Sequence, residues 1–279
     1  MCGIVGYIDK NVINENVLME MMEKIRHRGP DGSGFYMDDM IALGHRRLSI
    51  IDLEGGIQPM KNENGQLVCI FNGEIYNYQE LRNTLLDAGH IFVTNSDTEV
   101  LLHGYEQWGK ELPLKIRGMF AFAIWNREKK ELFCARDHFG VKPFYYFHKD
   151  NTFLFGSEIK CFLAHPNFEK KLNREQLELY LTYQYSPGET TFFQNTYKLL
   201  PAHYLIWKEG NISIEKYWEM DFEPEHNKTI GQWAEEIHKA MNDSVRVHKI
   251  SDVEVGSYLS SGVDSSYITG LSQVKKHLQ

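Results

Sequence analysis

In its first part the chain alternates short apolar runs with polar turns, a pattern typical of β-strands. Residues 2–8 form an apolar run that suits a buried strand, and residues 67–77 predict a strand that runs into a polar turn. Residues 118–140 and 143–158 each hold an apolar run, a charged turn and a second apolar run, which predicts two β-hairpins. Because the connections are short, we expect antiparallel pairing of these strands.

Helical periodicity appears in fewer places of the same region. Residues 14–26 repeat apolar side chains at helical spacing, and residues 172–186 predict a second helix that ends at a Pro-Gly pair. Residues 95–109 predict a third helix. Ser96 and Glu99 at its start match the capping box, in which each side chain accepts a hydrogen bond from the other residue's backbone.

The pattern changes near the C-terminal end of the sequence. Residues 189–228 are predicted to hold short strands and the polar stretch EPEHNK, and we expect a linker over 191–228. Residues 229–249 predict a long amphipathic helix, followed by a strand over 253–259 and a loop over 260–266 that leads into another helix. This is the opening of an α/β domain. Because one such unit cannot cover both faces of a parallel strand, we expect either a truncated piece of a longer protein or a poorly supported final segment.

Composition and charge are those of a globular protein with one large or two smaller domains, at 279 residues, 42% hydrophobic and 24% charged. The 38 acidic against 30 basic residues give a net charge of −8. Without a dense Lys/Arg stretch, we expect no nucleic-acid partner. No apolar run approaches the roughly 18–20 residues of a membrane span. The 4 cysteines form no Cys-x-x-Cys pair, so we expect a reducing, cytoplasmic location and no cysteine-based zinc site.

The cysteine at position 2 has two interpretations. Removal of Met1 would leave Cys2 with a free α-amine of pKa about 7.7–8.0 beside a thiol of pKa about 8.5, and that amine could act as a general base for a nucleophile. The alternative is a small hydrophobic residue at the end of a strand, because cysteine is among the most buried residue types. The residue alone leaves both open.

Several further residues could bind a substrate or stabilise charge, but each of them taken alone also has an ordinary structural explanation. In FNGEIYN, the Asn72 amide and the Gly73 N–H could form an oxyanion hole with Glu74 beside them for a cationic group, or the strand could simply turn. Arg47 could bind a carboxylate in bidentate fashion or be solvated. Asp97 at a helix start could bind a cation or serve the helix dipole.

Two loops resemble phosphate-binding loops to different degrees. In LSSGVDSS, residues 259–266, small residues lie between a predicted strand and a predicted helix, so backbone N–H groups could hold an anion; the alternative is an ordinary strand–helix joint. Residues 104–111 nearly match G-x-x-x-x-G-K-[ST], but Glu111 stands at the last position and the stretch ends a helix. We interpret the second loop as a helix C-terminus.

Taken together, the motifs resemble the glutamine-hydrolysing asparagine synthetases. They are MCGIVGY, RHRGPDG, HRRLSIID, FNGEIYN, SDTE, GMFAFAIWN, ARDHFGVKPFYY, KLLPAHY and YLSSGVDSS. The first seven resemble the class II, N-terminal-nucleophile glutaminase domain, and the last resembles the pyrophosphate loop of ATP-pyrophosphatase synthetase domains. The resemblance implies an α+β fold: an αββα sandwich of antiparallel sheets over residues 1–190, a linker over 191–228 and the start of an α/β synthetase domain over 229–279.

For the glutaminase half, the resemblance implies that Cys2 attacks the side-chain amide of glutamine and that Asn72 and Gly73 stabilise the oxyanion. Ammonia is then released and the thioester is hydrolysed. The resemblance also implies that Arg47 holds the α-carboxylate of glutamine. Glu74 and Asp97 would hold its α-amino group, and Ile50 and Ile51 would line the pocket.

For the synthetase half, the resemblance implies that ATP, with Mg²⁺, adenylates aspartate and that ammonia displaces AMP to give asparagine. The implied ATP-binding positions are Leu259, Ser260, Gly262, Asp264 and Ser265. Ser261 stands where the family usually has its first glycine. Because the sequence stops just past this loop, we expect this chain to support only the glutaminase half.

The partners implied are glutamine, aspartate and ATP, with a homodimer as the assembly. Another class II amidotransferase, making phosphoribosylamine or glucosamine 6-phosphate, is disfavoured by SSGVDSS. A β-lactam-synthetase-like relative without glutaminase activity is disfavoured by Cys2, Asn72 and Gly73. A non-catalytic or stand-alone glutamine-binding fragment stays open.

Overall fold

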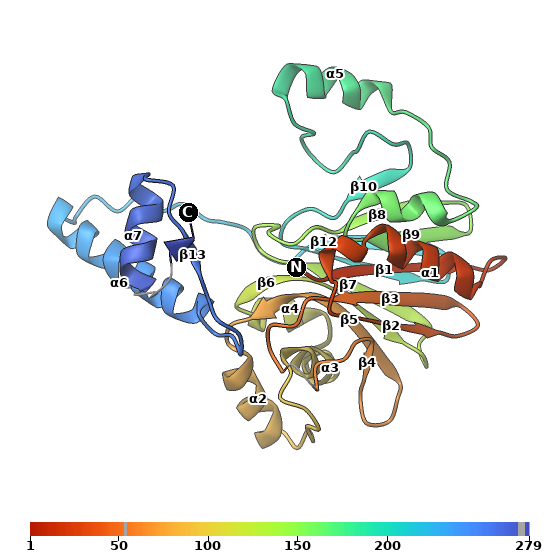
Figure 1. Ribbon diagram of the computed structural model, residues 1–279, viewed down its shortest axis with the longest axis horizontal. Coiled ribbons are helices and arrows are strands. Elements are labelled where there is room, and N and C mark those ends of the chain that lie inside the picture. Colours follow the sequence, from red (N-terminus) through yellow and green to blue (C-terminus); the bar gives the residue numbers. More distant parts are fainter. Residues whose placement is uncertain (53–54, 273–276, 279) are drawn as a thin grey trace. The chain divides into compact units, whose positions relative to one another are not determined.

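The computed structural model describes residues 1–52, 55–272 and 277–278 (Figure 1). Its contacts divide the chain into two compact units, Met1–Glu219 and Met220–Gln279. We describe each unit by itself.

The first unit contains two six-stranded sheets and a few helices. Its strands are β1 (Gly3–Asp9), β2 (Gly32–Met37), β3 (Ile41–Arg47), β4 (Met60–Lys61), β5 (Leu67–Ile75), β6 (Gly118–Asn126), β7 (Glu131–Arg136), β8 (Tyr145–Lys149), β9 (Thr152–Gly156), β10 (Thr196–Lys198), β11 (His203–Lys208) and β12 (Asn211–Lys216). Its helices are α1 (Glu15–Lys24), α2 (Tyr78–Asp87), α3 (Asp97–Trp108), α4 (Leu112–Lys115) and α5 (Arg174–Tyr183), with short 3-10 helices η1 (Arg26–Arg28), η2 (Gly109–Glu111) and η3 (Ile159–Ala164).

Both sheets of the first unit are antiparallel throughout their described pairings. Their strand orders are β10-β8-β9-β1-β3-β2 and β12-β11-β7-β6-β5-β4. The two hairpins predicted over 118–140 and 143–158 are confirmed as β6–β7 and β8–β9, with Trp125 opposite Leu132 and Phe147 opposite Leu154.

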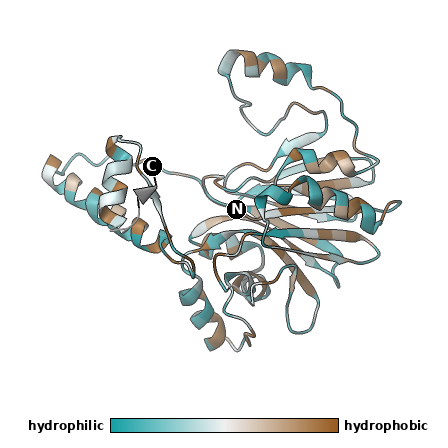
Figure 2. Cartoon of the chain, viewed as in Figure 1, coloured by the Kyte–Doolittle hydropathy of each residue, from teal (hydrophilic) through white to brown (hydrophobic). Residues whose placement is uncertain are grey.

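Three apolar layers hold these elements together. Between the sheets, Ile4 and Leu43 of one sheet share a buried cluster with Ile70 and Trp125 of the other. A second cluster joins the outer face of the β5–β6–β7 sheet to α2, α3 and α4, and a third joins the outer face of the other sheet to α1 and η3. Because both faces of the sheets are covered, β1 is buried at every position, and apolar residues follow one another along the central strands (Figure 2). The order of layers is helix, sheet, sheet, helix, as expected.

The segment 191–228, for which the sequence predicts a linker, contains three of these strands. β10 pairs with β8, and β11 lies between β7 and β12. Leu205 and Trp207 of β11 are buried, so this segment adds strands to both sheets of the first unit. The first unit therefore extends to Glu219 rather than to residue 190.

Helix α3 begins as predicted but with a different cap. The Ser96 side chain accepts a hydrogen bond from the Thr98 N–H. The Glu99 carboxylate does not return to Ser96; it accepts hydrogen bonds from the N–H groups of Val93 and Thr94, each at 2.7 Å. Ser96 is therefore the N-cap, but the predicted capping box between Ser96 and Glu99 is not formed, because Ser96 bonds Thr98 and Glu99 bonds the loop before the helix.

The second unit contains α6 (Ile230–His248), β13 (Ser257–Tyr258), α7 (Val263–Ser272) and β14 (His277–Leu278). The long helix predicted over 229–249 is confirmed, with a full capping box between Thr229 and Gln232. The strand predicted over 253–259 is reduced to β13, which pairs in parallel with the two-residue β14. Within the described ranges, no helix of the chain is long and apolar enough to cross a membrane.

Candidate active site

A single pocket of the first unit, about 60 Å³ in volume, is lined by all eight residues for which the sequence predicts a glutaminase role. They are Cys2, Arg47, Ile50, Ile51, Asn72, Gly73, Glu74 and Asp97. The pocket is also lined by residues that were not predicted, which are Met1, Leu48, Gly56, Gln58, Phe71, Ser96, Thr98 and Lys142.

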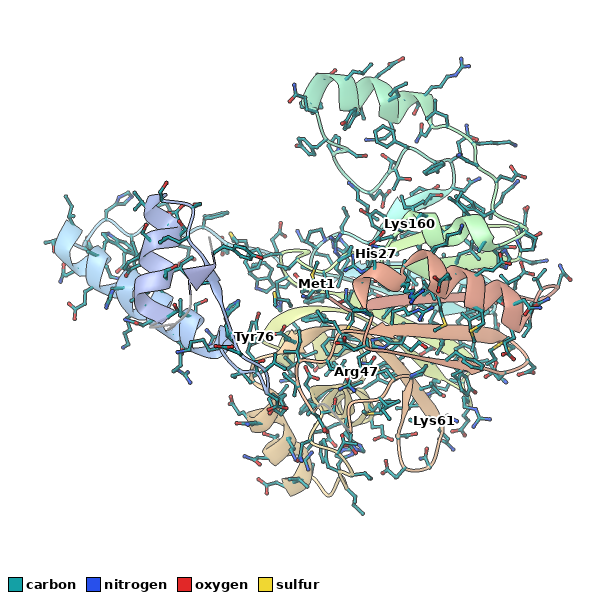
Figure 3. The ribbon with its side chains drawn as sticks, in the orientation of Figure 1. Met1, His27, Arg47, Lys61, Tyr76 and Lys160 are labelled. Atoms are coloured by element: carbon teal, nitrogen blue, oxygen red, sulfur yellow. The ribbon has the colours of Figure 1, made fainter. Side chains whose placement is uncertain are left out.

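Strand ends and one helix start meet at this pocket. Cys2 directly precedes β1, which pairs with β3 so that Gly3 lies opposite Arg46; Arg47, at the end of β3, is therefore next to Cys2. Asn72 and Gly73 lie on β5, and Asp97 is the first residue of α3. Figure 3 shows the side chains, with Met1 and Arg47 labelled.

The thiol of Cys2 is held by the backbone of one residue. Its Sγ atom accepts a hydrogen bond from the Leu48 N–H at 3.3 Å and donates one to the Leu48 carbonyl at 3.4 Å. The Cys2 carbonyl accepts a hydrogen bond from Arg28 Nε at 2.9 Å. Burial raises the pKa of the thiol and lowers the pKa of the Met1 α-amine. A base close to the thiol is therefore needed to make it a nucleophile.

The Asn72 side chain is 1% exposed, and neither its amide nitrogen nor its amide oxygen has a hydrogen-bond partner among the described residues. A buried polar group without a partner costs about 1–3 kcal/mol, and such groups in native proteins have a functional or structural reason. At the adjacent Gly73, an added Cβ would lie 2.1 Å from the Met119 carbonyl oxygen and 2.5 Å from a Phe71 ring carbon. Asn72 thus supplies a side-chain donor without a described partner. At position 73 the surrounding atoms leave room only for glycine.

The acidic side of the pocket is formed by Glu74 and Asp97. The Asp97 carboxylate accepts a hydrogen bond from the Ile75 N–H at 3.1 Å. Burial, together with the charge of nearby Glu74, raises the pKa of Asp97 to about 7. A cation bound between the two carboxylates relieves both effects. The same pocket is also lined by a basic residue, Lys142, which is 5% exposed. Burial lowers the pKa of its ammonium group.

Arg47 is oriented by the loop that follows β3. Its Nη2 donates hydrogen bonds to the carbonyl of Ile51 at 3.2 Å and to that of Asp52 at 2.5 Å. A Cβ added at Gly56 would lie 2.5 Å from the same Nη2 atom. The loop therefore encloses the guanidinium, and Ile50 and Ile51 line the pocket beside it.

Gln58 is a pocket residue that sequence reasoning missed. Its Oε1 accepts a hydrogen bond from the Phe71 N–H at 2.6 Å, and its Nε2 donates to Thr98 Oγ1 at 3.1 Å. It thereby ties β5 to α3 beside Asn72 and Asp97. Nothing in the local sequence marks Gln58. For Lys142 a signal existed, since it lies within the motif ARDHFGVKPFYY.

In the second unit, the predicted ATP-binding residues lie together in the loop between β13 and the first turn of α7. They are Leu259, Ser260, Gly262, Asp264 and Ser265. The Ser260 and Ser265 hydroxyl groups are 3.0 Å apart, and Ser265 Oγ donates to the Gly262 carbonyl. Ser261, at the position where the family usually has glycine, has φ of 62°, in the left-handed region that favours glycine.

Comparison with sequence families agrees with both units. The family described as "Glutamine amidotransferase domain" matches residues 1–218, and the family described as "Asparagine synthase" matches residues 236–278. The first match covers most of the chain.

Curated relatives include "Asparagine synthetase [glutamine-hydrolyzing] 1" of Bacillus subtilis (strain 168), 41% identical over an alignment that covers 98% of this chain and 44% of the relative. A "Putative asparagine synthetase [glutamine-hydrolyzing] 2" of Methanocaldococcus jannaschii is 38% identical, with 97% of this chain and 56% of the relative covered. The chain thus spans about half the length of the curated relatives it matches.

Among solved structures, a glutamine phosphoribosylpyrophosphate amidotransferase from B. subtilis, in complex with ADP and GMP, has a TM-score of 0.58 at 18% identity, covering 99% of this chain and 65% of that one. An allosteric regulatory enzyme of purine biosynthesis has a TM-score of 0.60, also at 18% identity, covering 99% and 64%. At this identity the likeness shows the fold alone, and it confirms the sandwich expected from the sequence.

Proposed function

This chain belongs to the glutamine amidotransferase domain family, and from that premise we propose that its first unit hydrolyses glutamine at Cys2. The observation that carries the proposal is the buried, unpartnered amide of Asn72 in the pocket that also contains Cys2. A free donor aimed at the place where negative charge develops is what acyl transfer needs.

The proposed reaction proceeds through a thioester. After removal of Met1, the α-amine of Cys2 takes the thiol proton, and Sγ attacks the carbon of the glutamine side-chain amide. Asn72 Nδ2 and the Gly73 N–H stabilise the oxyanion of the tetrahedral intermediate. Its collapse expels ammonia, which leaves with the proton that the amine accepted. Water then attacks the thioester and releases glutamate with the thiol restored.

The proposed substrate contacts follow from charge. Arg47, held between the carbonyls of the 50–52 loop, presents its guanidinium to the α-carboxylate of glutamine. Glu74 and Asp97 face the α-ammonium group. Ile50 and Ile51 complete this side of the pocket.

The second unit supports a wider proposal. We propose that its loop binds the pyrophosphate of ATP through Ser260, Gly262 and Ser265, with Leu259 near the adenosine. The exposed Asp264 carboxylate is an oxygen ligand of the kind that Mg²⁺ takes. Ammonia from the first unit then amidates aspartate, in a cytoplasmic asparagine synthetase that acts as a homodimer. Support comes from the family match over 236–278 and from the curated relatives, of which the chain spans about half.

The test measures ammonia release from glutamine by the chain processed to begin at Cys2, with Cys2→Ala as the matched variant. Release by the processed chain and none by the variant supports the proposal. Release that persists in Cys2→Ala contradicts the nucleophile. Binding of glutamine without release, by a chain shown to be processed, supports the alternative of a non-catalytic glutamine-binding fragment.

A further inference from the structure

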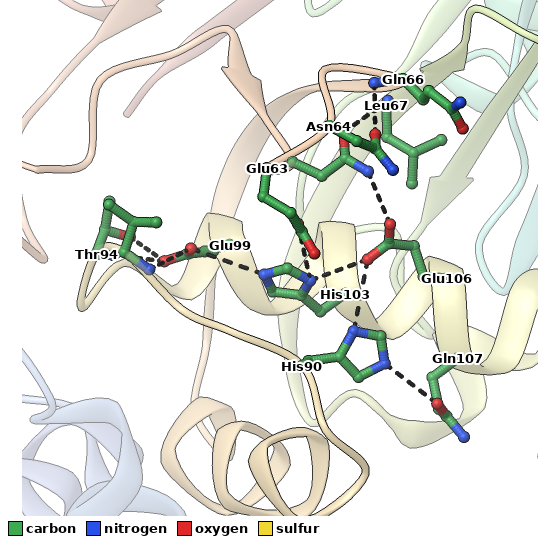
Figure 4. A network of polar contacts seen from close by, with 12 residues as sticks. Glu63, Asn64, Gln66, Leu67, His90, Thr94, Glu99, His103, Glu106 and Gln107 are labelled. Atoms are coloured by element: carbon green, nitrogen blue, oxygen red, sulfur yellow. Dashed lines mark hydrogen bonds and ion pairs between the residues drawn. The ribbon is translucent and has the colours of Figure 1, made fainter.

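A second cluster of titratable side chains lies in the first unit and takes no part in the reaction proposed above. It comprises His90, His103 and Glu106, of which His103 and Glu106 lie one turn apart on α3 and His90 follows α2 (Figure 4). One ligand atom from each of the three lies within 4.8 Å of the others. From this arrangement we propose that the cluster is a binding site for a divalent transition-metal ion of the zinc type.

The hydrogen bonds of His90 give the first argument. Its Nε2 lies 3.1 Å from Gln107 Oε1, which can only accept, so Nε2 is the donor of this hydrogen bond. The other ring nitrogen, Nδ1, faces Glu106 Oε2 at 3.6 Å. A metal ion held between these two atoms would be bound by both of them. Gln107 thus orients the ring so that Nδ1 faces Glu106.

The buried ring of His103, which is 1% exposed, supplies the second nitrogen of the cluster. Its Nδ1 lies 2.9 Å from Glu106 Oε2 and 3.9 Å from Glu63 Oε2, while its Nε2 faces Glu99 Oε1 at 3.7 Å. Three carboxylate side chains therefore surround one buried imidazole ring, and a bound metal ion would neutralise part of their charge.

The surroundings match the outer contacts of known metal sites, in which a ligating histidine donates its second N–H to a carboxylate or carbonyl oxygen and a ligating carboxylate is itself hydrogen-bonded. Gln107 is such an acceptor for the ring of His90, and the Glu99 carboxylate lies 3.7 Å from the second nitrogen of His103. The second oxygen of Glu106, Oε1, accepts a hydrogen bond from Asn62 Nδ2 at 2.7 Å. Each of the three proposed ligands therefore has a polar neighbour that can orient it.

The donor set selects the class of ion. Two imidazole nitrogens and one carboxylate oxygen suit zinc and its neighbours, whereas Mg²⁺ and Ca²⁺ take oxygen ligands. Glu63, whose side chain is 46% exposed beside His103, is placed to become a fourth ligand. A bound ion would tie α3 to the turn after α2 and to the loop before β5, so its role would be to hold the helix that begins at Asp97.

The test uses the full chain carrying Cys2→Ala, so that the pocket thiol contributes no metal ligand. The protein is stripped with a chelator and titrated with Zn²⁺ by calorimetry. We expect one Zn²⁺ per chain, and Co²⁺ substituted for it should give the visible absorption of a four-coordinate site.

The variants separate this site from others. His90→Ala should weaken Zn²⁺ binding more than about 100-fold, and Gln107→Leu, which removes only an outer contact, about 10–100-fold. The exposed His226 belongs to the other unit, and His226→Ala should leave the affinity unchanged. Absence of Zn²⁺ binding, or equal affinity in His90→Ala and the parent chain, overturns the proposal in favour of a proton-held cluster. If His90→Ala does not fold, Glu106→Gln takes its place with the same expected loss.

Discussion

The Sγ atom of Cys2 and the backbone of Leu48 form a reciprocal pair, with the Leu48 N–H donating to sulfur at 3.3 Å and the thiol donating to the Leu48 carbonyl at 3.4 Å. The pair spans the join between β1 and β3, so sheet pairing itself sets the position of the thiol. Burial keeps the pKa of Cys2 above its ordinary value. The reaction also needs a base within reach of the thiol, and the proposed base is the α-amine that the processed chain exposes at Cys2.

Retention of Met1 should therefore abolish glutamine hydrolysis. With Met1 in place, the nitrogen of Cys2 is an amide and cannot accept a proton, which removes a general-base contribution of about 10²–10⁴-fold. The check is to sort preparations by intact mass and to compare their rates of ammonia release. A cleavable fusion that exposes Cys2 serves as the control and should restore activity. Equal rates with and without Met1 would show that another group is the base.

The substitution Asn72→Ala should lower kcat about 10²–10³-fold with little change in KM, because in the proposed reaction the amide stabilises only the oxyanion. Its effect on stability should be small or favourable, since the buried amide has no described partner to lose. Steady-state kinetics and urea unfolding measure the two effects.

The matched control is Asn62→Ala. Asn62 is also buried, but it donates to Glu106 at 2.7 Å and accepts from the Leu67 N–H at 2.9 Å. This variant should lose about 1–3 kcal/mol of unfolding free energy and keep its glutaminase activity. A stability loss at Asn72 as large as that at Asn62 would mean that Asn72 is a structural residue.

The carboxyl of Asp97 should make stability depend on pH. Burial and Glu74 raise its pKa to about 7 in the folded chain, from an ordinary value of 3.8. The folded state therefore binds more protons than the unfolded state, and the contribution is present at low pH and is lost as pH rises through about 7. Between pH 5 and 7, the free energy of unfolding should fall relative to Asp97→Asn by about 1.4 kcal/mol per pH unit. Parallel pH-dependent unfolding curves for the two proteins would refute this.

The same carboxyl should set the pH dependence of glutamine binding. In the proposed complex the α-ammonium group binds the ionised form of Asp97, so KM for glutamine should rise as pH falls below about 7, by up to about tenfold per unit. In Asp97→Asn, KM should be high and nearly independent of pH over this range. Initial-rate measurements from pH 5 to 8 decide the matter, and a pH-independent KM in the parent chain would remove Asp97 from the substrate contacts.

The substitution Ser261→Gly should stabilise the loop before α7. A non-glycine residue at φ of 62° is strained by roughly 1–2 kcal/mol, so relief should slow hydrogen exchange in the first turn of α7 by about 5- to 30-fold. Ser266→Gly, placed inside the same helix, should do the opposite because glycine in a helix costs about 1 kcal/mol. Faster exchange in Ser261→Gly would show that the left-handed conformation carries no strain.

The sequence predicted much of the first unit because its signals are local. Each hairpin is encoded in one continuous stretch whose apolar runs and charged turn need no distant partner. For the segment 191–228 the short strands were predicted, but the segment was assigned to a linker, because only the pairing of β10 with β8 and of β11 with β7 joins these strands to the sheets. Glu99 was assigned to a capping box on spacing alone, although its nearest N–H donors belong to the preceding loop.

Candidate residues were found where they lie inside dense motifs and were missed where they do not. Asn72, Gly73 and Glu74 are consecutive, so the sequence shows them together. Gln58 lies in no such motif. Its hydrogen bonds to Phe71 and Thr98 form only once β5 and α3 have packed together.

By itself the sequence determined the strand-rich character of the first unit, the helix-led second unit and the chemical identity of each candidate group, because these depend on residue type and short-range periodicity. Tertiary structure decided which groups meet. The pocket joins residues from 1 to 142, and the His90, His103 and Glu106 cluster joins the end of α2 to the middle of α3. Burial decided the rest: the unpartnered amide of Asn72 and the raised pKa of Asp97 arise because folding removes these groups from water.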